Sequence, residues 1–309
     1  MVHPSPCHPS QMSSEQLRKI AEQMEGREFS DDPAIAMEQR QDAFLAGFVG
    51  DETYQHGEVH YVDSSGALRT LRDSGASVPQ PPDTLRLVLI SDTHEQHGKL
   101  DMPPGDVLVH TGDLLLFNSR YRRTTSMDKL REFNRWLGEL PYRECVVIGG
   151  NHDASLEELG RDGVREVLSN CVYLENEAVE LEWSKLRVFG SPASVANLLP
   201  AWRGGGKSNS PNKAFQSYSE QDLDHAFRAA PAGQDILLIH GPIDSLPAAQ
   251  EFIAKHNPPL VISGHVHEGH GVEVAGSTLV VNATTMGPTF APTNAPMVID
   301  VPRPRRSKL

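Results

Sequence analysis

Short apolar runs alternate with amphipathic stretches along most of the chain after residue 84. The apolar runs have the length and the Val, Ile and Leu content of buried strands: Leu85–Ile90, Asp106–His110, Cys145–Ile148, Leu186–Phe189, Asp235–Ile239, Leu260–Ile262, Thr278–Val281 and Met297–Val301. Between several of them, apolar residues recur at helical spacing: Met127–Leu140, Leu156–Leu168, Glu220–Ala230 and Leu246–His256. Strands that alternate with helices predict an α/β fold with helices covering the sheet.

Residues 1–83 have a different pattern, and we expect them to form a small, mainly helical N-terminal extension. A capping box at Ser13 and apolar spacing near Pro33–Phe48 predict two helices. Glu58–Arg72 predicts a hairpin that turns at Asp63–Gly66, and a proline-rich linker follows up to residue 83. The expected organisation is the extension (1–83), a catalytic domain (84–302) and a basic tail (303–309).

Five of the predicted strands end in side chains that bind metals, next to glycines or other small residues. The side chains that we assign as ligands are Asp92, His94, Asp113, Asn151, His240, His265 and His267. Because ligands bind in open α/β sheets beyond the carboxyl ends of the strands, these side chains are expected to meet. A single such strand end would be a weak signal, whereas five in succession indicate a metal site.

The ligand types form one coherent set for two ions. Asp92, His94 and His267 could hold one ion and Asn151, His240 and His265 the other, with Asp113 bridging the two. Nitrogen and oxygen ligands without thiolate indicate two divalent ions of Mn, Fe or Zn. Such a pair would lower the pKa of a shared water to supply hydroxide, and would neutralise the oxygens of a phosphoryl group.

Other polar residues near these strand ends have predicted roles beside the metals. His152 could contact a phosphate oxygen or protonate the leaving oxygen, and Asp153 could orient the imidazole of His152. His110 is expected to support a metal ligand rather than to bind a metal itself, and His97 is expected to have a structural role. A separate pair, His56 and His60, is expected at the surface, as is His270, which has no predicted partner.

These motifs resemble, in order, the signature of the calcineurin-like metallophosphoesterases. Besides the ligands, Asp106–Asp113, Phe133–Gly138, His267–Gly271 and Pro296–Pro302 are similar to the metallophosphoesterase-domain-containing branch, whose members resemble cyclic-nucleotide phosphodiesterases. The resemblance implies a four-layer α/β/β/α sandwich and places His152 on the scissile phosphate. The longer Gly-Asp-x-x-Asp-Arg-Gly element of the phosphoprotein phosphatases is replaced here by Leu114–Phe117, which argues against that activity.

The composition of the chain limits the classes of partner that we expect it to bind. The net charge of −13 argues against a nucleic acid polymer, whose phosphates are neutralised by Lys and Arg. Three unpatterned cysteines suit a reducing compartment. We find no signal peptide and no apolar run of membrane-spanning length, so a soluble protein without a membrane partner is expected.

The final tripeptide, Ser307-Lys308-Leu309, matches a peroxisomal address. It predicts an import receptor as partner and a location in the peroxisomal matrix or a related organelle. If the tripeptide is not used, a cytoplasmic location is expected.

The sequence therefore favours a dinuclear metal-dependent phosphoesterase that hydrolyses a small phosphodiester, with a cyclic nucleotide as candidate substrate. A phosphomonoesterase or a pyrophosphohydrolase would use the same residues. A non-catalytic nucleotide-binding or scaffold protein of the same fold is the alternative from another class.

Overall fold

The computed structural model describes residues 58–71, 78–116, 123–195, 212–216, 226–228, 230–287 and 290–304. The two helices expected before residue 50 and the terminal tripeptide lie outside these ranges, as does most of the helix expected at Glu220–Ala230. Within the described residues, no helix combines the length and the apolar character that crossing a bilayer requires.

The first sheet has seven strands in the order β2-β1-β13-β3-β4-β5-β6. Its strands are β1 (Val59–Val62), β2 (Leu68–Leu71), β3 (Thr84–Ile90), β4 (Val107–His110), β5 (Glu144–Val147), β6 (Val172–Tyr173) and β13 (Met297–Pro302). β3, β4, β5 and β6 pair in parallel, whereas β13 is antiparallel to β3. β3 is buried from Leu85 to Ile90 because it is covered on both faces, as its continuous apolar run predicts.

The second sheet has six strands in the order β11-β12-β10-β9-β8-β7. Its strands are β7 (Glu177–Glu180), β8 (Arg187–Ser194), β9 (Ile236–Gly241), β10 (Leu260–Ser263), β11 (Gly271–Ala275) and β12 (Thr278–Asn282). β8, β9, β10 and β12 are parallel. β7 and β11 were not predicted, because both are edge strands with many exposed residues and lack an apolar run.

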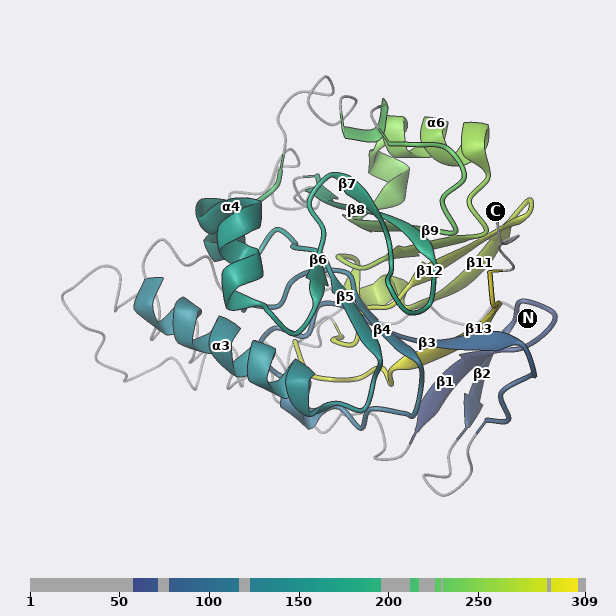
Figure 1. The fold of residues 1–309 in the computed structure, drawn as a ribbon, viewed down its shortest axis with the longest axis horizontal. Coiled ribbons are helices and arrows are strands. Elements are labelled where there is room, and N and C mark those ends of the chain that lie inside the picture. Colours follow the sequence, from purple (N-terminus) through teal and green to yellow (C-terminus); the bar gives the residue numbers. More distant parts are fainter. Residues whose placement is uncertain are drawn as a thin grey trace, which may run out of the picture.

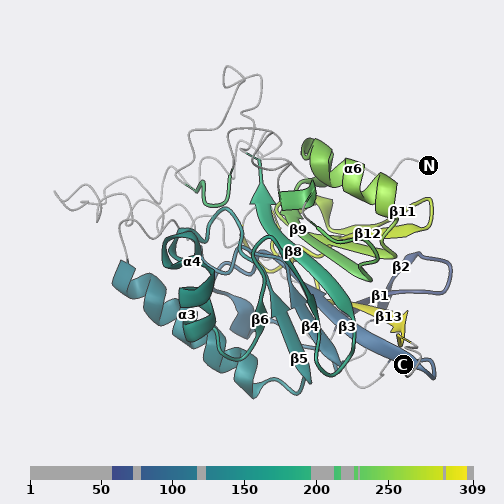
Figure 2. The same cartoon turned by 45° about the horizontal axis from the view of Figure 1, so that its top comes forward.

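The two sheets and their helices form four layers (Figures 1 and 2). Leu85, Leu87 and Leu89 of β3 pack with Ile236 and Leu238 of β9 in the core between the sheets. On the opposite face of β3, Val88 and Ile90 share a core with Leu130 and Phe133 of α3 (Arg123–Glu139). This alternation follows from the period of two along a strand.

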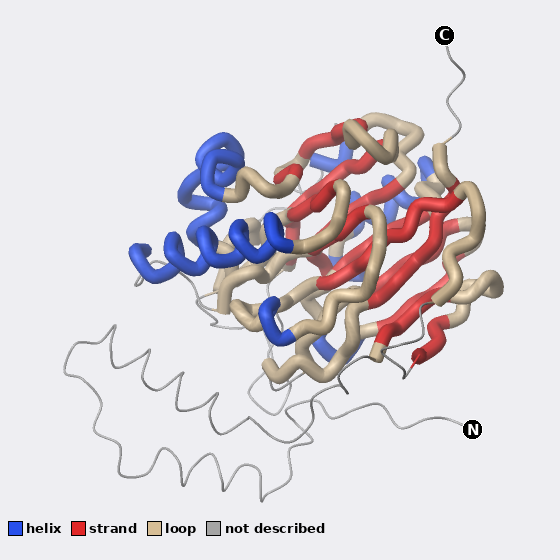
Figure 3. Tube along the Cα trace, turned by 60° about the horizontal axis from the view of Figure 1, so that its bottom comes forward, coloured by secondary structure: helices blue, strands red, loops and turns tan. Residues whose placement is uncertain are grey.

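The remaining helices complete the outer layers. α4 (Ala154–Val167) lies beside α3 over the first sheet, and Leu156 and Val164 belong to the same core as Leu130. α6 (Pro247–His256) covers the second sheet, where Phe252 packs with Leu237 and Ile239. Figure 3 shows the strands at the centre of the molecule and the helices around them. The predicted α/β/β/α sandwich is confirmed.

The hairpin of β1 and β2 belongs to the first sheet. It has the predicted turn, in which the backbone N–H of Gly66 donates to the carbonyl of Asp63. However, β1 pairs in parallel with β13, with His60 opposite Met297. The hairpin that we grouped with the N-terminal extension is therefore hydrogen-bonded into the same sheet as β3, a contact between segments too distant in sequence for local patterns to indicate.

Candidate metal centre

Side chains from the carboxyl ends of strands in both sheets meet at one place. Asp92 and His94 follow β3, Asp113 follows β4 and Asn151 follows β5. His240 lies near the end of β9, and His265 and His267 follow β10. All the ligands predicted from the sequence thus come from one edge of the two packed sheets, where parallel strands place their carboxyl ends.

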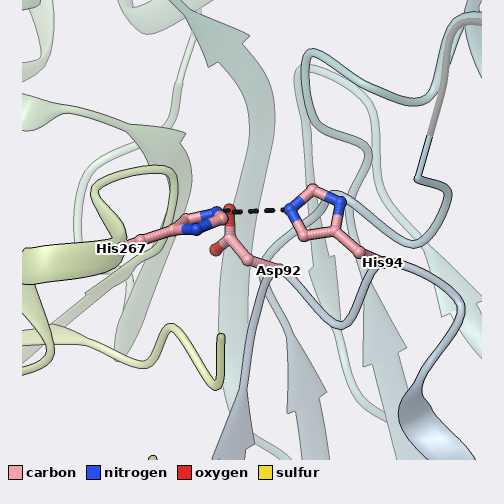
Figure 4. Close-up of side chains that lie close together, drawn as sticks. All are labelled: Asp92, His94 and His267. Carbon is pink, nitrogen blue, oxygen red and sulfur yellow. Dashed lines mark hydrogen bonds and ion pairs between the residues drawn. The ribbon is translucent and has the colours of Figure 1, made fainter. Parts of the chain in front are cut away.

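The first group consists of Asp92, His94 and His267 (Figure 4). The Nε2 atoms of His94 and His267 are 3.2 Å apart, and the Nε2 atom of His267 is 3.6 Å from Oδ1 of Asp92. His94 and Asp92 are fully buried. Ligand atoms this close together can bind the same ion.

The hydrogen bonds of this group determine where its protons lie. Nδ1 of His94 contacts the carbonyl of Leu115 at 3.0 Å, and Nδ1 of His267 contacts the carbonyl of Gly287 at 2.9 Å. Because a carbonyl only accepts hydrogen bonds, both Nδ1 atoms carry the proton. When both rings are neutral, their Nε2 atoms carry lone pairs, and the two lone pairs face each other. A cation between them is the partner that this arrangement fits.

The second group consists of Asp113, His240 and His265, together with Asn151. The side-chain oxygen of Asn151 is 3.0 Å from Nε2 of His240 and 2.7 Å from Nδ1 of His265. The two ring nitrogens are 3.2 Å apart. Nδ1 of His240 donates to the carbonyl of Thr111, which leaves Nε2 of His240 as an acceptor in the neutral ring.

Asp113 lies between the two groups. Its Oδ1 atom is 3.4 Å from Nε2 of His240, and its Oδ2 atom is 3.9 Å from Nε2 of His94. The backbone N–H of His152 donates to Oδ1 at 2.8 Å and orients the carboxylate. The two oxygens therefore face different groups, as a bridging ligand requires.

The electrostatics of the site suit cations. Although burial opposes ionisation, His267 and His240 keep the pKa of Asp92 below its usual range. Burial and the neighbouring His152 lower the pKa of His94 to about 3, so its imidazole is neutral. For His240, burial lowers the pKa but Asp113 more than compensates and raises it to about 9. Buried carboxylates and imidazoles form a mixed oxygen and nitrogen donor set that suits a divalent metal, which would take the place of the proton on His240.

The backbone adopts a rare conformation at four of these ligands. Asp92, His94, Asp113 and His265 all have positive φ angles, of 53°, 42°, 56° and 68°. Such conformations are uncommon for residues with a Cβ atom and occur often at functional sites. Gly150 permits the close approach of the strand ends, since a Cβ atom there would overlap the carboxylate of Asp113.

His152 lies at the edge of both groups. Its Nδ1 atom donates to the carbonyl of Leu116 at 2.6 Å, and its Nε2 atom lies 3.9 Å from Oδ2 of Asp113. The side-chain amide of Asn212 is 3.2 Å from Nε2 of His152. The ring is thus held by its Nδ1 side and presents Nε2 toward the centre.

Asp153 does not orient His152, contrary to our expectation. Its carboxylate accepts hydrogen bonds from the backbone N–H groups of Leu114, Leu115 and Gly150. It is fully buried and ties the loop after β4 to the loop after β5. The carbonyl of Leu116 holds His152 instead, and a backbone partner of this kind cannot be inferred from side-chain spacing.

His110 and His97 lie behind the centre. Nδ1 of His110 accepts from the backbone N–H of Gly112, so in the neutral ring Nε2 carries the proton and donates to the hydroxyl of Thr93 at 2.9 Å. His110 thereby connects the loops that carry Asp92 and Asp113, which agrees with the predicted supporting role. His97 packs its ring against Phe133 and Trp136, away from the ligands.

Comparisons with known proteins decide the family. A family model described as calcineurin-like phosphoesterase matches residues 85–269. The chain belongs to the calcineurin-like phosphoesterase family. The match spans the strand ends that carry all seven predicted ligands, and the family indicates a metal-dependent phosphoesterase that binds divalent ions.

The relatives of this phosphoesterase support the predicted branch. It is 31% identical to metallophosphoesterase domain-containing protein 1 of Homo sapiens and of Mus musculus, over 74% of either chain. A UPF0046 protein of Caenorhabditis elegans is 27% identical over 79% of this chain and 90% of its own. The resemblance to the metallophosphoesterase-domain-containing branch is confirmed.

The phosphoesterase site also contains residues that sequence reasoning missed. Thr284 donates its hydroxyl proton to Asp92, and the ring of Phe290 lies 4.8 Å from that of His94. Two histidines expected at the surface, His60 and His270, are instead partly buried and hydrogen-bonded to each other. Neither Thr284 nor Phe290 is a metal-binding residue type, so a search for ligand patterns passes over both.

Proposed function

We propose that this phosphoesterase hydrolyses a small phosphodiester, and that a cyclic nucleotide is the substrate to test first. Asp92, His94 and His267 would hold one divalent ion, and Asn151, His240 and His265 the other, with Asp113 shared between them. When bound, the two ions supply Lewis acidity toward the phosphoryl oxygens and lower the pKa of a coordinated water. Mn, Fe and Zn all suit this mixed nitrogen and oxygen set.

His152 is the side chain that we propose for proton transfer. Its Nδ1 atom is committed to the carbonyl of Leu116, so only Nε2 can exchange a proton with substrate. Nε2 lies within 3.9 Å of Asp113, near the place where a phosphoryl group would sit between the two groups of ligands. A protonated Nε2 there can donate to the leaving oxygen of the ester as the P–O bond breaks.

The charge of the site favours a diester over a monoester. Within the described residues, the side chains that contact the carboxylates of Asp92 and Asp113 are histidines and a threonine, with no lysine or arginine among them. A phosphomonoester carries close to two negative charges at neutral pH, whereas a diester carries one. A site in which, among the described residues, no lysine or arginine adds to the positive charge beside the carboxylates is better matched to the single charge of a diester, and this observation carries the proposal.

The position of Phe290 is a reason to propose an aromatic group on the substrate. Its ring centroid lies 4.8 Å from that of His94 and 4.9 Å from that of His267, and the residue is partly exposed. An aromatic face beside a phosphoryl site can stack on a nucleobase. This placement is the specific reason to test nucleotides before simple alkyl diesters.

Paired substrates test the proposal directly. Purified protein loaded with Mn is assayed with bis(4-nitrophenyl) phosphate, 4-nitrophenyl phosphate and a set of cyclic nucleotides. We expect kcat/KM for the diester to exceed that for the monoester by at least about tenfold, or about 1.4 kcal/mol in barrier. A preference for the monoester would favour the phosphomonoesterase alternative. Nucleotide binding without turnover by metal-loaded protein would favour a non-catalytic role.

We also propose that Ser307-Lys308-Leu309 delivers the protein to peroxisomes through their import receptor. The proposal depends on these three residues, since the receptor reads a free carboxyl-terminal tripeptide. A fluorescent protein fused before residue 1 should colocalise with a peroxisomal marker and should lose that location when Leu309 is deleted. A fusion that stays in the cytoplasm in both forms would refute it.

A further inference from the structure

A chain of hydrogen bonds connects the N-terminal hairpin with the metal centre. It starts at Glu58, which precedes β1, and continues through His60 on β1 to His270, which follows the ligand His267. Nδ1 of His60 and Nε2 of His270 are 2.7 Å apart, and Nδ1 of His270 is 2.9 Å from the carbonyl of Thr284. On its other side, Nε2 of His60 is 3.3 Å from a carboxylate oxygen of Glu58.

The proton positions along this chain follow from its last acceptor. The carbonyl of Thr284 can only accept, so Nδ1 of His270 carries the proton. In the neutral ring, Nε2 of His270 is then the acceptor, and Nδ1 of His60 must donate to it. The two hydrogen bonds between His60 and Thr284 therefore point from the hairpin toward Thr284, and each ring is held in one orientation. The carboxylate of Glu58 can only accept, so its contact with Nε2 of His60 is a hydrogen bond that His60 donates when its ring is protonated.

The same contacts show that Glu58, His60 and His270 form a chain of hydrogen bonds rather than a metal-binding site. Glu58 and His270 contact opposite nitrogens of the His60 ring. A single ion cannot bind through both sides of one imidazole. The separation of 2.7 Å also suits an N–H···N hydrogen bond, and it is shorter than the 3.2 Å between the facing nitrogens of His94 and His267.

Thr284 is the residue through which this chain reaches Asp92. Its hydroxyl donates to Oδ2 of Asp92 at 3.0 Å, and it is fully buried. The backbone N–H of His265 donates to both oxygens of Asp92, at 2.9 Å from Oδ2 and 3.1 Å from Oδ1. With Oδ2 held by two donors, Oδ1 is the atom that faces His267.

The backbone of Thr284 is itself fixed by neighbours. Its carbonyl accepts from His270 and from the side-chain amide of Asn294, and its N–H donates to Asn282. His60 is anchored as well, because its backbone N–H donates to the carbonyl of Pro296. The hydroxyl that contacts Asp92 thus projects from a backbone that His60 and His270 help to hold.

We propose that Thr284 positions Asp92 for metal binding, and that Glu58, His60 and His270 hold Thr284 in place. The hairpin then contributes to the affinity of the site formed by Asp92, His94 and His267, although no hairpin residue contacts that site directly. This inference rests on the proposed metal assignment and extends it to residues that are neither ligands nor substrate contacts. Partners that orient a ligating carboxylate commonly change metal affinity by about 10–100-fold when removed.

Three variants separate this role from a general effect on folding. Thr284→Val keeps the shape of the side chain but removes the hydroxyl, and Thr284→Ser keeps the hydroxyl. His270→Leu breaks the chain one step earlier. Thr70→Val, at an exposed position of β2, and His256→Leu, on α6, are the matched controls in the same protein.

The experiment measures ion binding directly. Co²⁺ is titrated into each full-length, chelator-treated variant, the two binding steps are followed by visible absorption, and circular dichroism checks the fold. For Thr284→Val we expect one of the two steps to weaken by about 10–100-fold while the other changes less. Thr284→Ser should restore that step, His270→Leu should weaken the same step by a smaller factor, and both controls should match the parent.

The outcomes distinguish this inference from the proposed function. If Thr284→Val binds both ions as tightly as the parent, or if Thr284→Ser weakens binding as much as valine does, the positioning role is overturned. If the parent binds two ions and the variants behave as expected but no diester is hydrolysed, the positioning role stands and the proposed function fails. A parent that binds no ion overturns both.

Discussion

The imidazoles of His94 and His267 face each other with their Nε2 atoms 3.2 Å apart, and each ring donates its Nδ1 proton to a backbone carbonyl. Two neutral rings in this arrangement direct lone pairs at each other. A divalent ion held by both rings and by the carboxylate of Asp92 would relieve the repulsion between the lone pairs. The fold therefore holds these ligand atoms close enough together to bind one cation.

Removing divalent ions should lower the free energy of unfolding. An ion that binds only the folded chain, present at a hundred times its Kd, stabilises by about 2.7 kcal/mol. Urea unfolding with EDTA and with added Mn measures this difference. In the variant His267→Leu the gain should be smaller, because one group has lost a ligand. An equal gain in both proteins would show that the stabilising ion binds elsewhere.

Replacing Asp113 and His152 by alanine should have different effects on ion content and on kcat. Asp113→Ala removes the carboxylate that faces both groups, so we expect metal analysis to show the loss of both ions. His152→Ala should retain both ions and lose kcat by about 10²–10⁴-fold, because it removes a proton donor rather than a ligand. Unchanged ion content in Asp113→Ala would refute the bridging assignment.

Asp153 should matter for stability more than for chemistry. In Asp153→Asn an amide NH₂ group replaces one of the oxygens that accept from the N–H groups of Leu114, Leu115 and Gly150. We expect unfolding to become easier by about 1–3 kcal/mol, the cost of leaving a buried donor unpaired. Asp162→Asn, whose side chain is 90% exposed on α4, is the control and should change little. A variant Asp153→Asn of unchanged stability that had lost kcat would instead favour a direct catalytic role.

His97 should make the fold less stable in acid. Burial lowers the pKa of His97 to about 4, whereas an unfolded histidine titrates near 6.5. As the pH falls from about 6.5 toward about 4, the unfolded chain binds a proton that the folded chain excludes, so stability decreases. At pH 5 this amounts to about 2 kcal/mol.

The variant His97→Leu removes this titration and keeps an apolar side chain against Phe133 and Trp136. The difference in unfolding free energy between pH 7.5 and pH 5 should therefore be smaller in His97→Leu than in the parent by about 2 kcal/mol. Urea unfolding at both pH values, with the metal content held constant, checks it. An identical loss of stability in both proteins would show that His97 does not contribute to the acid sensitivity.

The sequence by itself determined most of the strands, the presence of helices that cover the sheets and the seven residues that converge. These follow from local rules: a buried parallel strand is a continuous apolar run, and its carboxyl end faces the ligand site. Asp92, Asp113 and Asn151 could therefore be placed together before any contact between them was known. Three edge strands were not predicted: β6 has only two residues, and β7 and β11 are half-exposed and lack that apolar signal.

Only the tertiary structure decided which partner each polar group has. His60 and His270 are 210 positions apart, and nothing in the spacing of either residue indicates that they form a hydrogen bond. Asp153 stands next to His152 in sequence, yet its carboxylate contacts the backbone of a different loop. A hydrogen bond depends on the direction of a side chain and on the position of a distant backbone atom, and both are set by the packing of the whole fold rather than by neighbouring residues.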